Sequence, residues 1–291
     1  MSHAVAIYFT RAGWTPTDNV SARAPELHPL RDRTIAHFGV GCLGGPSALE
    51  FARAGVGELR ILDDDHVDPA TIVRWPFGLS AAGLPKVQVI SEFIEKNYPA
   101  TRVIAMRHRL GAARGPKGEG RSDLEVMEQM TAGASILFDA TAEIGVQHYL
   151  SDVAAKQGIP YVSVVGTYGG WGGEVVCITP GRTEGCWMCY RHAIEDASIP
   201  VCPSDPNGKI QPRGCGDVTF TAAGFDMTQV ALMAVRTAVA VLCRGAPGGY
   251  PAAPWDVLTL KFRDESGQLI VPETRGHHLP RHAQCPRCKE Q

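Results

Sequence analysis

This 291-residue chain lacks a long apolar run, an excess of one charge and a secretion-type N-terminus. The formal net charge is only −2, so no basic field favours nucleic acid as a partner. No apolar run reaches the roughly 18 residues that cross a membrane. The first residues, MSHAVAIYFTRAGWTP, have neither a charged start nor a long apolar core, which argues against a signal peptide. We therefore expect a cytoplasmic protein without nucleic-acid or membrane partners.

The chain also lacks an even number of cysteines. Its nine cysteines, without a secretion signal, argue against a disulfide framework. Four of them form two CxxC pairs, Cys186 with Cys189 and Cys285 with Cys288, which 95 residues separate. Each pair can supply two thiolates, and four thiolates make a closed tetrahedral zinc site. A redox dithiol is the alternative, but two pairs in one chain favour structural Zn²⁺.

What the chain does contain, from Thr34 onwards, is an alternation of strand and helix patterns. Residues 1–33 show no steady period and are interpreted as an N-terminal arm, and residues 34–291 as one domain. Strands are predicted at 34–41, 58–65, 102–110, 134–141, 159–170, 172–181, 255–263 and 268–275, and helices at 44–55, 85–98, 122–132, 145–157 and 218–243. This order predicts an α/β fold with a Rossmann-like, doubly wound, mostly parallel sheet and an antiparallel extension.

A glycine-rich loop, HFGVGCLGG, follows the first predicted strand. Gly39, Gly41 and Gly44 make the pattern G-x-G-x-x-G: a tight turn, a backbone that can approach phosphate, and close contact between helix and strand. Backbone amides at the helix N-terminus would then face an anion. Asp63 ends the second strand, where an acid can bind ribose hydroxyls. A purely structural glycine turn is the alternative.

The loop alone fits NAD and ATP equally, and the residues after it separate the two. Arg74 and Lys86 follow the second strand. The phosphates of a nucleoside triphosphate carry several negative charges close together and need two such cations, whereas a dinucleotide does not. Asp139 ends a later strand at the same edge, where a carboxylate suits Mg²⁺. Each residue alone could be a surface ion pair. As an ordered series they favour ATP.

This series, followed by the two CxxC pairs, resembles the ubiquitin-activating-enzyme-like adenylating proteins, the ThiF/MoeB/HesA family, over most of the chain. The resemblance implies that the nucleotide-binding residues lie in the glycine loop and at the strand ends: Gly39, Gly41, Gly44, Asp63, Asp65, Arg74, Lys86 and Asp139. Of these, Asp63 would hold the ribose, Arg74 and Lys86 would clamp the phosphates, and Asp139 would ligate Mg²⁺. The four CxxC cysteines would tether the C-terminus through Zn²⁺.

Two motifs differ from the family pattern. N-x-x-R-Q reads Thr71 to Trp75 here, so Asn and Gln are replaced. D-x-T-D-N reads Asp139 to Glu143, with alanine at the position of the second acid, so that acid is shifted or absent. The resemblance also implies a homodimer in which an arginine from the partner's N-terminal segment reaches ATP. Arg11 and Arg23 both suit that role.

Family members adenylate the C-terminal glycine of a ubiquitin-like or sulfur-carrier protein, and some then form a thioester on their own cysteine. The proline-rich crossover at about 190–217 holds two cysteines. Cys215 is favoured, because Arg213 and the helix expected from residue 218, with Asp217 as its N-cap, would both stabilise its thiolate. Cys202, between two prolines, lacks those neighbours.

The resulting hypothesis is an activating enzyme that forms a thioester on Cys215, with Arg74, Lys86 and Asp139 aligning the reactants and a conjugating enzyme as an optional later partner. A sulfur-carrier adenylyltransferase without a thioester is the first alternative. The second is an inactive scaffold of the same fold, for which Thr71, Trp75 and Ala142 are the evidence. An NAD-dependent oxidoreductase is the remaining one, although the sequence shows no hydride-transfer site.

Overall fold

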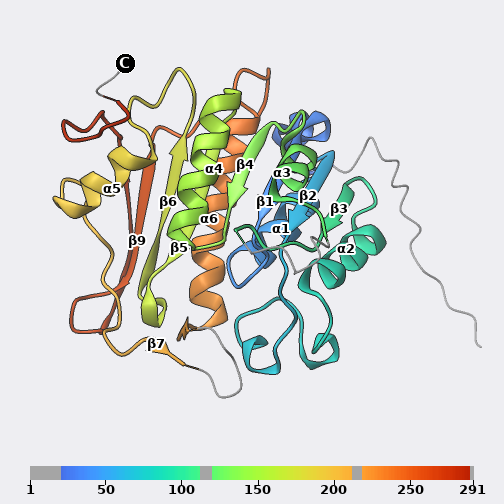
Figure 1. The fold of residues 1–291 in the computed structure, drawn as a ribbon, viewed down its shortest axis with the longest axis horizontal. Helices are drawn as coiled ribbons and strands as arrows, with labels where there is room; N and C mark the ends of the chain where they lie inside the picture. The colour runs from blue at the N-terminus through green and yellow to red at the C-terminus, as the bar shows by residue number, and fades with distance from the viewer. Residues whose placement is uncertain (1–20, 112–119, 212–217, 289–291) are drawn as a thin grey trace, which may run out of the picture.

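The computed structural model describes residues 21–111, 120–211 and 218–288, and its centre is one eight-stranded sheet (Figure 1). The strand order is β10-β9-β6-β5-β4-β1-β2-β3, with a separate two-stranded sheet of β7 and β8. The strands are β1 (Thr34–Phe38), β2 (Glu58–Leu62), β3 (Arg102–Met106), β4 (Ile136–Asp139), β5 (Tyr161–Gly166), β6 (Gly172–Ile178), β7 (Lys209–Ile210), β8 (Thr219–Phe220), β9 (Val257–Arg263) and β10 (Leu269–His277). The α-helices are α1 (Gly44–Arg53), α2 (Lys86–Asn97), α3 (Asp123–Thr131), α4 (Ile144–Gln157), α5 (Trp187–Glu195) and α6 (Gly224–Leu242).

The first five strands of the sheet are parallel, and the other three are antiparallel. β1 lies between β2 and β4, and β3 and β5 extend this parallel part on either side. β6, β9 and β10 then add in antiparallel order. The predicted Rossmann-like α/β fold with an antiparallel extension is therefore confirmed. In the parallel register Phe38 pairs with both Leu62 and Asp139, so the three strands that carry the predicted site end side by side.

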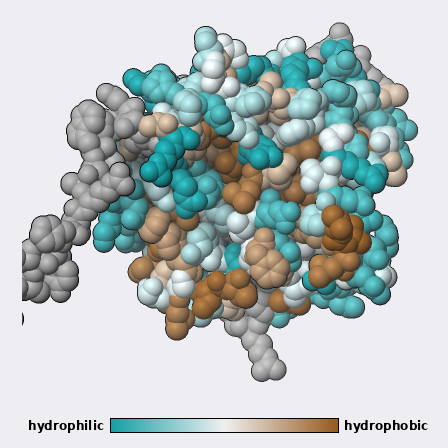
Figure 2. Space-filling view, turned by 180° about the vertical axis from the view of Figure 1, so that it is seen from behind, coloured by the Kyte–Doolittle hydropathy of each residue, from teal (hydrophilic) through white to brown (hydrophobic). Residues whose placement is uncertain are grey.

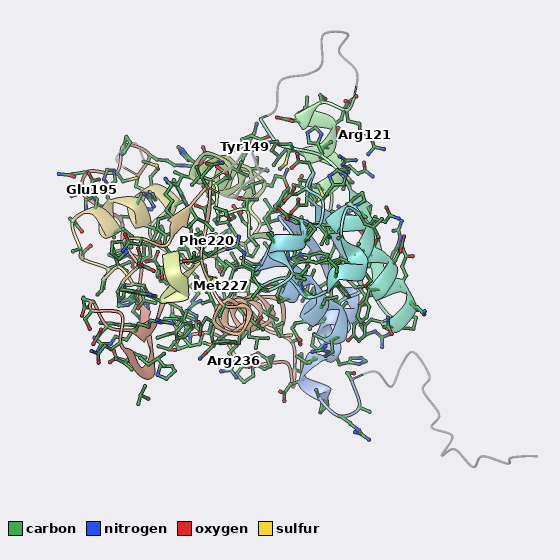
Figure 3. All side chains as sticks on the ribbon, turned by 90° about the horizontal axis from the view of Figure 1, so that it is seen from below. Arg121, Tyr149, Glu195, Phe220, Met227 and Arg236 are labelled. Carbon is green, nitrogen blue, oxygen red and sulfur yellow. The ribbon has the colours of Figure 1, made fainter. Side chains whose placement is uncertain are left out.

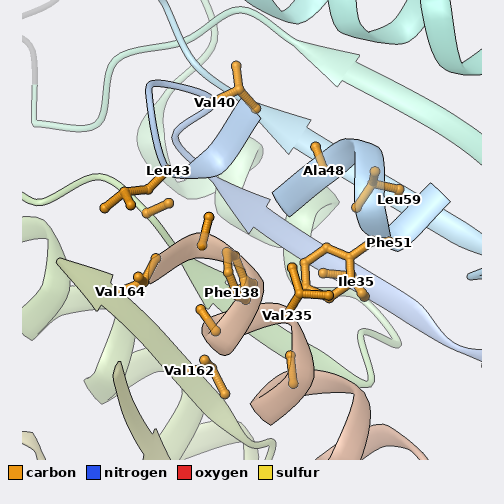
Figure 4. Packing of buried hydrophobic residues seen from close by; sticks show 14 of the residues in the cluster. Ile35, Val40, Leu43, Ala48, Phe51, Leu59, Phe138, Val162, Val164 and Val235 are labelled. Atoms are coloured by element: carbon orange, nitrogen blue, oxygen red, sulfur yellow. The ribbon is translucent and has the colours of Figure 1, made fainter. Parts of the chain in front are cut away.

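Helices cover both faces of the sheet, which explains why its central strands are apolar almost throughout. One core layer packs α1, α2 and α6 against the sheet, and Phe51, Phe138 and Val235 meet in it (Figure 4). The other layer packs α3, α4 and α5, with Met130 and Leu150 fully buried. Viewed along the sheet, α4 and α6 lie on opposite sides (Figure 3).

Two expected elements differ in the structure. The long helix predicted from residue 218 begins at Gly224 instead, because Thr219 and Phe220 pair with β7. A helix that was not predicted, α5, covers the start of the segment interpreted as an irregular crossover. Within the predicted N-terminal arm, a 3-10 helix spans Pro25–Asp32 and buries Leu30 in the core.

Helix α6 is long and apolar enough to cross a membrane by length and composition, with a mean hydropathy of 1.4, yet 61% of it is buried against the sheet. A stripe of its residues stays exposed, with Phe225 and Leu232 at 77% and 44% exposure. At the sheet edge, β10 exposes most of its side chains, and Leu269 and Val271 are among the most exposed apolar residues.

Candidate functional site

The glycine loop between β1 and α1 is built as the sequence pattern requires. Gly39 has a φ of +80°, and a side chain there would lie 2.9 Å from the carbonyl carbon of Ala140, the residue that follows β4. A side chain on Gly44 would overlap the carbonyl oxygen of Gly39, so helix and loop can pack only without one. Gly41 has nothing within 4 Å of its Cβ direction, so its backbone faces open space.

Helix α1 leaves its N-terminal amides without a side-chain cap. The cap residue, Leu43, makes no such hydrogen bond, and the first turn carries no acid. The positive end of the helix dipole, with no acidic or capping side chain against it, favours an anion at this point. The open backbone at Gly41 and this helix end together form a cradle that fits a phosphate.

Asp63 holds the glycine loop in place. One of its carboxylate oxygens accepts from the Val40 amide at 2.7 Å, and the other from the Asp65 amide at 2.9 Å. The carboxylate is only partly buried, so its remaining lone pairs can still accept from a ligand. This position fits the expected ribose contact, which stays a prediction.

The two predicted cations are held by different partners. The buried Lys86 donates from its ammonium group to Asp65, whose side chain is 63% exposed. Arg74 donates to the Phe220 carbonyl oxygen of β8 and lies partly buried. Burial raises the pKa of the Cys42 thiol, and the charges of Arg74 and Lys86 oppose that rise. Both cations therefore act on the glycine loop itself.

Trp75, which sequence reasoning treated only as a departure from the family pattern, supports the loop. Its indole nitrogen donates to the Val40 carbonyl oxygen at 2.8 Å. A side chain on Gly45 would lie 3.1 Å from the same indole nitrogen, so the ring packs directly against the start of α1. The only sequence signal for this contact was an aromatic residue next to Arg74, the arginine predicted to bind phosphate.

Asp139, the predicted Mg²⁺ ligand, lies below the surface. One carboxylate oxygen accepts from the Thr141 amide at 3.0 Å and the Thr141 hydroxyl at 2.7 Å, and the other accepts from the Tyr161 hydroxyl at 2.7 Å. The residue is fully buried, and burial raises the pKa of its carboxyl group. In this arrangement Asp139 does not fit a metal ligand, because both oxygens are engaged and neither faces solvent. Its role towards Mg²⁺ stays a prediction.

The four CxxC cysteines meet in one cluster. All four sulfur atoms lie within 4.8 Å of one another. Cys186 lies 3.8 Å from Cys189 and 3.6 Å from Cys285, and Cys189 lies 3.5 Å from Cys288. Zinc–sulfur bonds of about 2.3 Å in a tetrahedron place sulfurs roughly 3.8 Å apart, so the donor set fits Zn²⁺. The His282 amide donates to Cys189 at 3.3 Å and would stabilise a bound thiolate.

Of the two cysteines considered for a thioester, the structure describes Cys202 but not Cys215. Cys202 is buried, and its thiol donates to the carbonyl oxygens of Gly173 at 3.3 Å and Leu260 at 3.0 Å. Burial raises its pKa to about 12, so it is unsuited to be a nucleophile. Cys215 lies outside the described residues and stays a prediction. One argument for it is wrong, because the following helix begins at Gly224 and its dipole is too distant.

The arginines considered for the partner's site are not brought to the glycine loop by any contact in the described part of the chain. Arg23 is exposed, and Arg11 lies outside the described residues. A surface pocket of about 290 Å³ lies beside Arg74, between the outer face of α1, the segment before Trp75 and the start of α6. Leu49 and Gly224 line it. The described residues therefore bring the glycine loop together with two acids and two cations at one edge of the sheet, and this arrangement can bind a polyphosphate. The acids are Asp63 and Asp65, and the cations are Arg74 and Lys86.

Comparison with known proteins bears on this site. The sequence model of the ThiF family matches residues 19–262. The chain is 33% identical over 275 residues to the Sinorhizobium fredii protein y4qC, covering 92% of this chain and 46% of that protein. It is 31% identical over 246 residues to the adenylyltransferase and sulfurtransferase UBA4 of Yarrowia lipolytica, covering 81% of this chain and 55% of UBA4. The chain thus spans about half the length of these relatives.

Similarity to solved structures concerns the fold. The crystal structure of Escherichia coli MccB with ATP superposes with a TM-score of 0.63 at 14% identity, over 89% of this chain and 68% of MccB. The Escherichia coli sulfur carrier protein ThiS adenylyltransferase is similar in sequence, 27% identical over 161 residues, which cover 55% of this chain and 59% of that enzyme.

Proposed function

The chain belongs to the ThiF family, and we propose that it uses ATP to adenylate the C-terminal glycine carboxylate of a ubiquitin-like or sulfur-carrier protein. The observation that carries this proposal is the gathering of an uncapped helix N-terminus, Asp63, Arg74 and Lys86 around one glycine loop. Adenylyltransferases among the sequence relatives support the same chemistry.

The proposed reaction is a displacement at phosphorus. A carboxylate oxygen of the carrier attacks the α-phosphorus of ATP, a new P–O bond forms, and the bond to the β-phosphate bridging oxygen breaks as pyrophosphate leaves. No enzyme nucleophile or proton transfer is needed, so alignment and charge neutralisation determine the rate. Amides at the start of α1 would hold a phosphate, Lys86 and Arg74 would offset its charge, and Asp63 would orient the ribose. Mg²⁺ bound with ATP would supply further positive charge.

Burial of Lys86 makes its contribution testable. Its ammonium group already has one anionic partner, Asp65, so an incoming phosphate would share a fixed, partly dehydrated cation. By analogy with donors that stabilise a transition-state anion, loss of this contact should cost about 3 kcal/mol, roughly a hundredfold in rate.

The test is ATP–pyrophosphate exchange with a panel of carrier proteins that end in glycine. We expect exchange with at least one carrier, and a loss of about a hundredfold in Lys86→Ala. Lys96→Ala is the matched control, because Lys96 is an exposed lysine on the same helix. Equal exchange in Lys86→Ala and wild type would refute the assignment. Absence of ATP-dependent exchange, together with a nicotinamide-dependent redox activity, would favour an oxidoreductase instead.

We also propose that the activated carrier passes to Cys215 as a thioester. The thiolate would attack the acyl adenylate, forming a C–S bond as AMP leaves, and a conjugating enzyme could accept the acyl group. A carrier adduct that thiols release, absent in Cys215→Ala and retained in Cys202→Ala, is the expected result. Adenylate without an adduct would mean a sulfur-carrier adenylyltransferase instead.

A homodimer is the proposed assembly. The exposed stripe of α6 places Phe225, Gln229, Leu232 and Arg236 along one helix face, and Val73, at 69% exposure, is also on the surface. Figure 2 shows groups of hydrophobic side chains on the face turned away from the viewer of Figure 1. We expect a dimer in sedimentation experiments and a shift to monomer in a variant with Phe225→Lys and Leu232→Lys. An unchanged mass in that variant would exclude this face.

An inactive scaffold is the second candidate. The observation that favours it is the engaged, buried carboxylate of Asp139, together with Ala142 where the family pattern has an acid. Isothermal titration with Mg²⁺–ATP separates the two, because a scaffold that has lost the site would release no heat.

A further inference from the structure

We infer that the β7–β8 hairpin positions Arg74 for the nucleotide, with Thr219 and Phe220 as the positioning residues. This inference rests on the proposed function, since it assigns a structural support to one of the cations of that site. The hairpin lies 145 residues away from Arg74 along the chain, so nothing in the local sequence connects them.

Three contacts fix the guanidinium group. One terminal nitrogen donates to the Phe220 carbonyl oxygen, and the other donates to the Thr219 hydroxyl oxygen at 2.7 Å. The guanidinium carbon lies 4.6 Å from the centroid of the Phe220 ring. Two hydrogen bonds and one stacked face leave a planar group little freedom to rotate.

The hairpin is itself held against the body of the protein. Phe220 pairs with Lys209 of β7, and its ring lies 6.3 Å from that of Tyr168. The Thr221 amide donates to the Gly208 carbonyl oxygen at 2.7 Å, and Gly208 packs directly on Tyr168. Phe220 also packs against the core layer that contains Met227 of α6. The support beneath Arg74 is therefore part of the packed structure.

The backbone at Arg74 is held from two further sides. A side chain on Gly224 would lie 2.8 Å from the Val73 carbonyl oxygen and 3.1 Å from the Arg74 Cα, so α6 begins in direct contact with this segment. On the other side, Trp75 is bonded to the glycine loop through Val40. Residues 74 and 75 thus connect the glycine loop on one side with the hairpin on the other.

The guanidinium keeps donors for a ligand. Arginine has five N–H donors, and the two bonds to β8 use two of them. The remaining three have no recorded partner among the described residues. Trp75, the next residue, is bonded to Val40 of the glycine loop, and Arg74 lines a surface pocket together with Pro46 of the first turn of α1, so these donors lie close to a phosphate bound at that end of the helix. A fixed cation loses less freedom on binding than a mobile one, so the hairpin raises affinity without touching the nucleotide.

The experiment measures Mg²⁺–ATP and adenosine binding by titration calorimetry in the full chain. Thr219→Val removes the acceptor and keeps the shape, and we expect about tenfold weaker ATP binding with unchanged adenosine binding. Thr219→Ser should restore ATP affinity. Thr221→Val is the matched control, because its hydroxyl bonds to Gly208 and not to Arg74. Thermal unfolding of each variant checks that the hairpin still folds.

A double-mutant cycle tests whether Thr219 acts on ATP affinity through Arg74. In an Arg74→Ala background, Thr219→Val should change ATP affinity less than twofold, since the group that it positions is gone. If Arg74→Ala weakens ATP binding but Thr219→Val does not, or if Thr219→Val acts equally in both backgrounds, the inference is overturned. If the wild-type chain does not bind ATP at all, the proposed function fails first, and this outcome is distinguishable from the other two.

Discussion

A buried histidine below the glycine loop should make the fold sensitive to acid. His37 is fully buried on β1, its ring centroid is 4.8 Å from that of Phe138, and neither ring nitrogen has a hydrogen-bond partner within the part of the chain that the structure describes. Burial lowers its pKa from 6.5 to about 3. The ring also packs against the start of α1, where a side chain on Gly44 would lie 3.0 Å from it.

The sign and size of the effect follow from proton linkage. The pKa of His37 in the folded protein lies below its value in the unfolded chain. As pH falls below 6.5, the unfolded chain therefore binds a proton at His37 that the native protein does not bind. Stability is therefore lost on acidification down to about pH 3. Between pH 7.5 and pH 4.5 the loss from this residue is about 2.5 kcal/mol, using about 1.4 kcal/mol per pKa unit.

The assay is urea unfolding at pH 7.5 and pH 4.5. Other groups titrate in this range, so the quantity of interest is the stability difference between His37→Leu and wild type. We expect this difference to move by about 2.5 kcal/mol in favour of the variant at the lower pH. Ile35→Val, a substitution on the same strand without a titrating group, should show the same difference at both pH values. A pH-independent difference for His37→Leu would refute the reasoning.

Three further predictions follow from described contacts. Burial raises the folded pKa of Asp139, so wild type should lose stability relative to Asp139→Asn as pH rises through the carboxyl range; equal pH profiles by urea unfolding would contradict this. Cys285→Ser should lower the zinc content measured by atomic emission and reduce the unfolding temperature, whereas unchanged zinc would exclude the cluster. Gly44→Ala should destabilise the loop and weaken ATP binding at least tenfold, because its side chain overlaps Gly39, while Gly145→Ala, with open space around it, should not.

The sequence was sufficient for the parallel part of the fold because its signals are local. Apolar runs, glycine turns and helix periods each lie within a few residues, and the predicted strands agree with β1 through β5 to within a few residues. The start of α6 was misplaced because an apolar pattern continues from Val218 onwards. Only pairing with β7 across the crossover makes Thr219 and Phe220 a strand.

The candidate site was predicted as a set of residues, and its internal contacts were not. Lys86 and Asp63 lie at the expected sheet edge, since parallel strands bring their ends together. The burial of Asp139 depends on the hydroxyl of Tyr161 from the neighbouring strand, and the setting of Arg74 depends on β8. Both partners are distant in sequence, and no local pattern marks them.

Strand β10, at one edge of the eight-stranded sheet, bears on whether copies of this protein associate edge to edge at high concentration. β10 is an open edge with exposed Leu269 and Val271, the kind of strand that recruits a neighbouring chain into filaments. Pro272 has no amide hydrogen to offer, and the register shifts between Leu269 and Glu273. A proline and a register shift within this edge interrupt a continuous ladder of hydrogen bonds, so we expect the edge to pair poorly with a further strand.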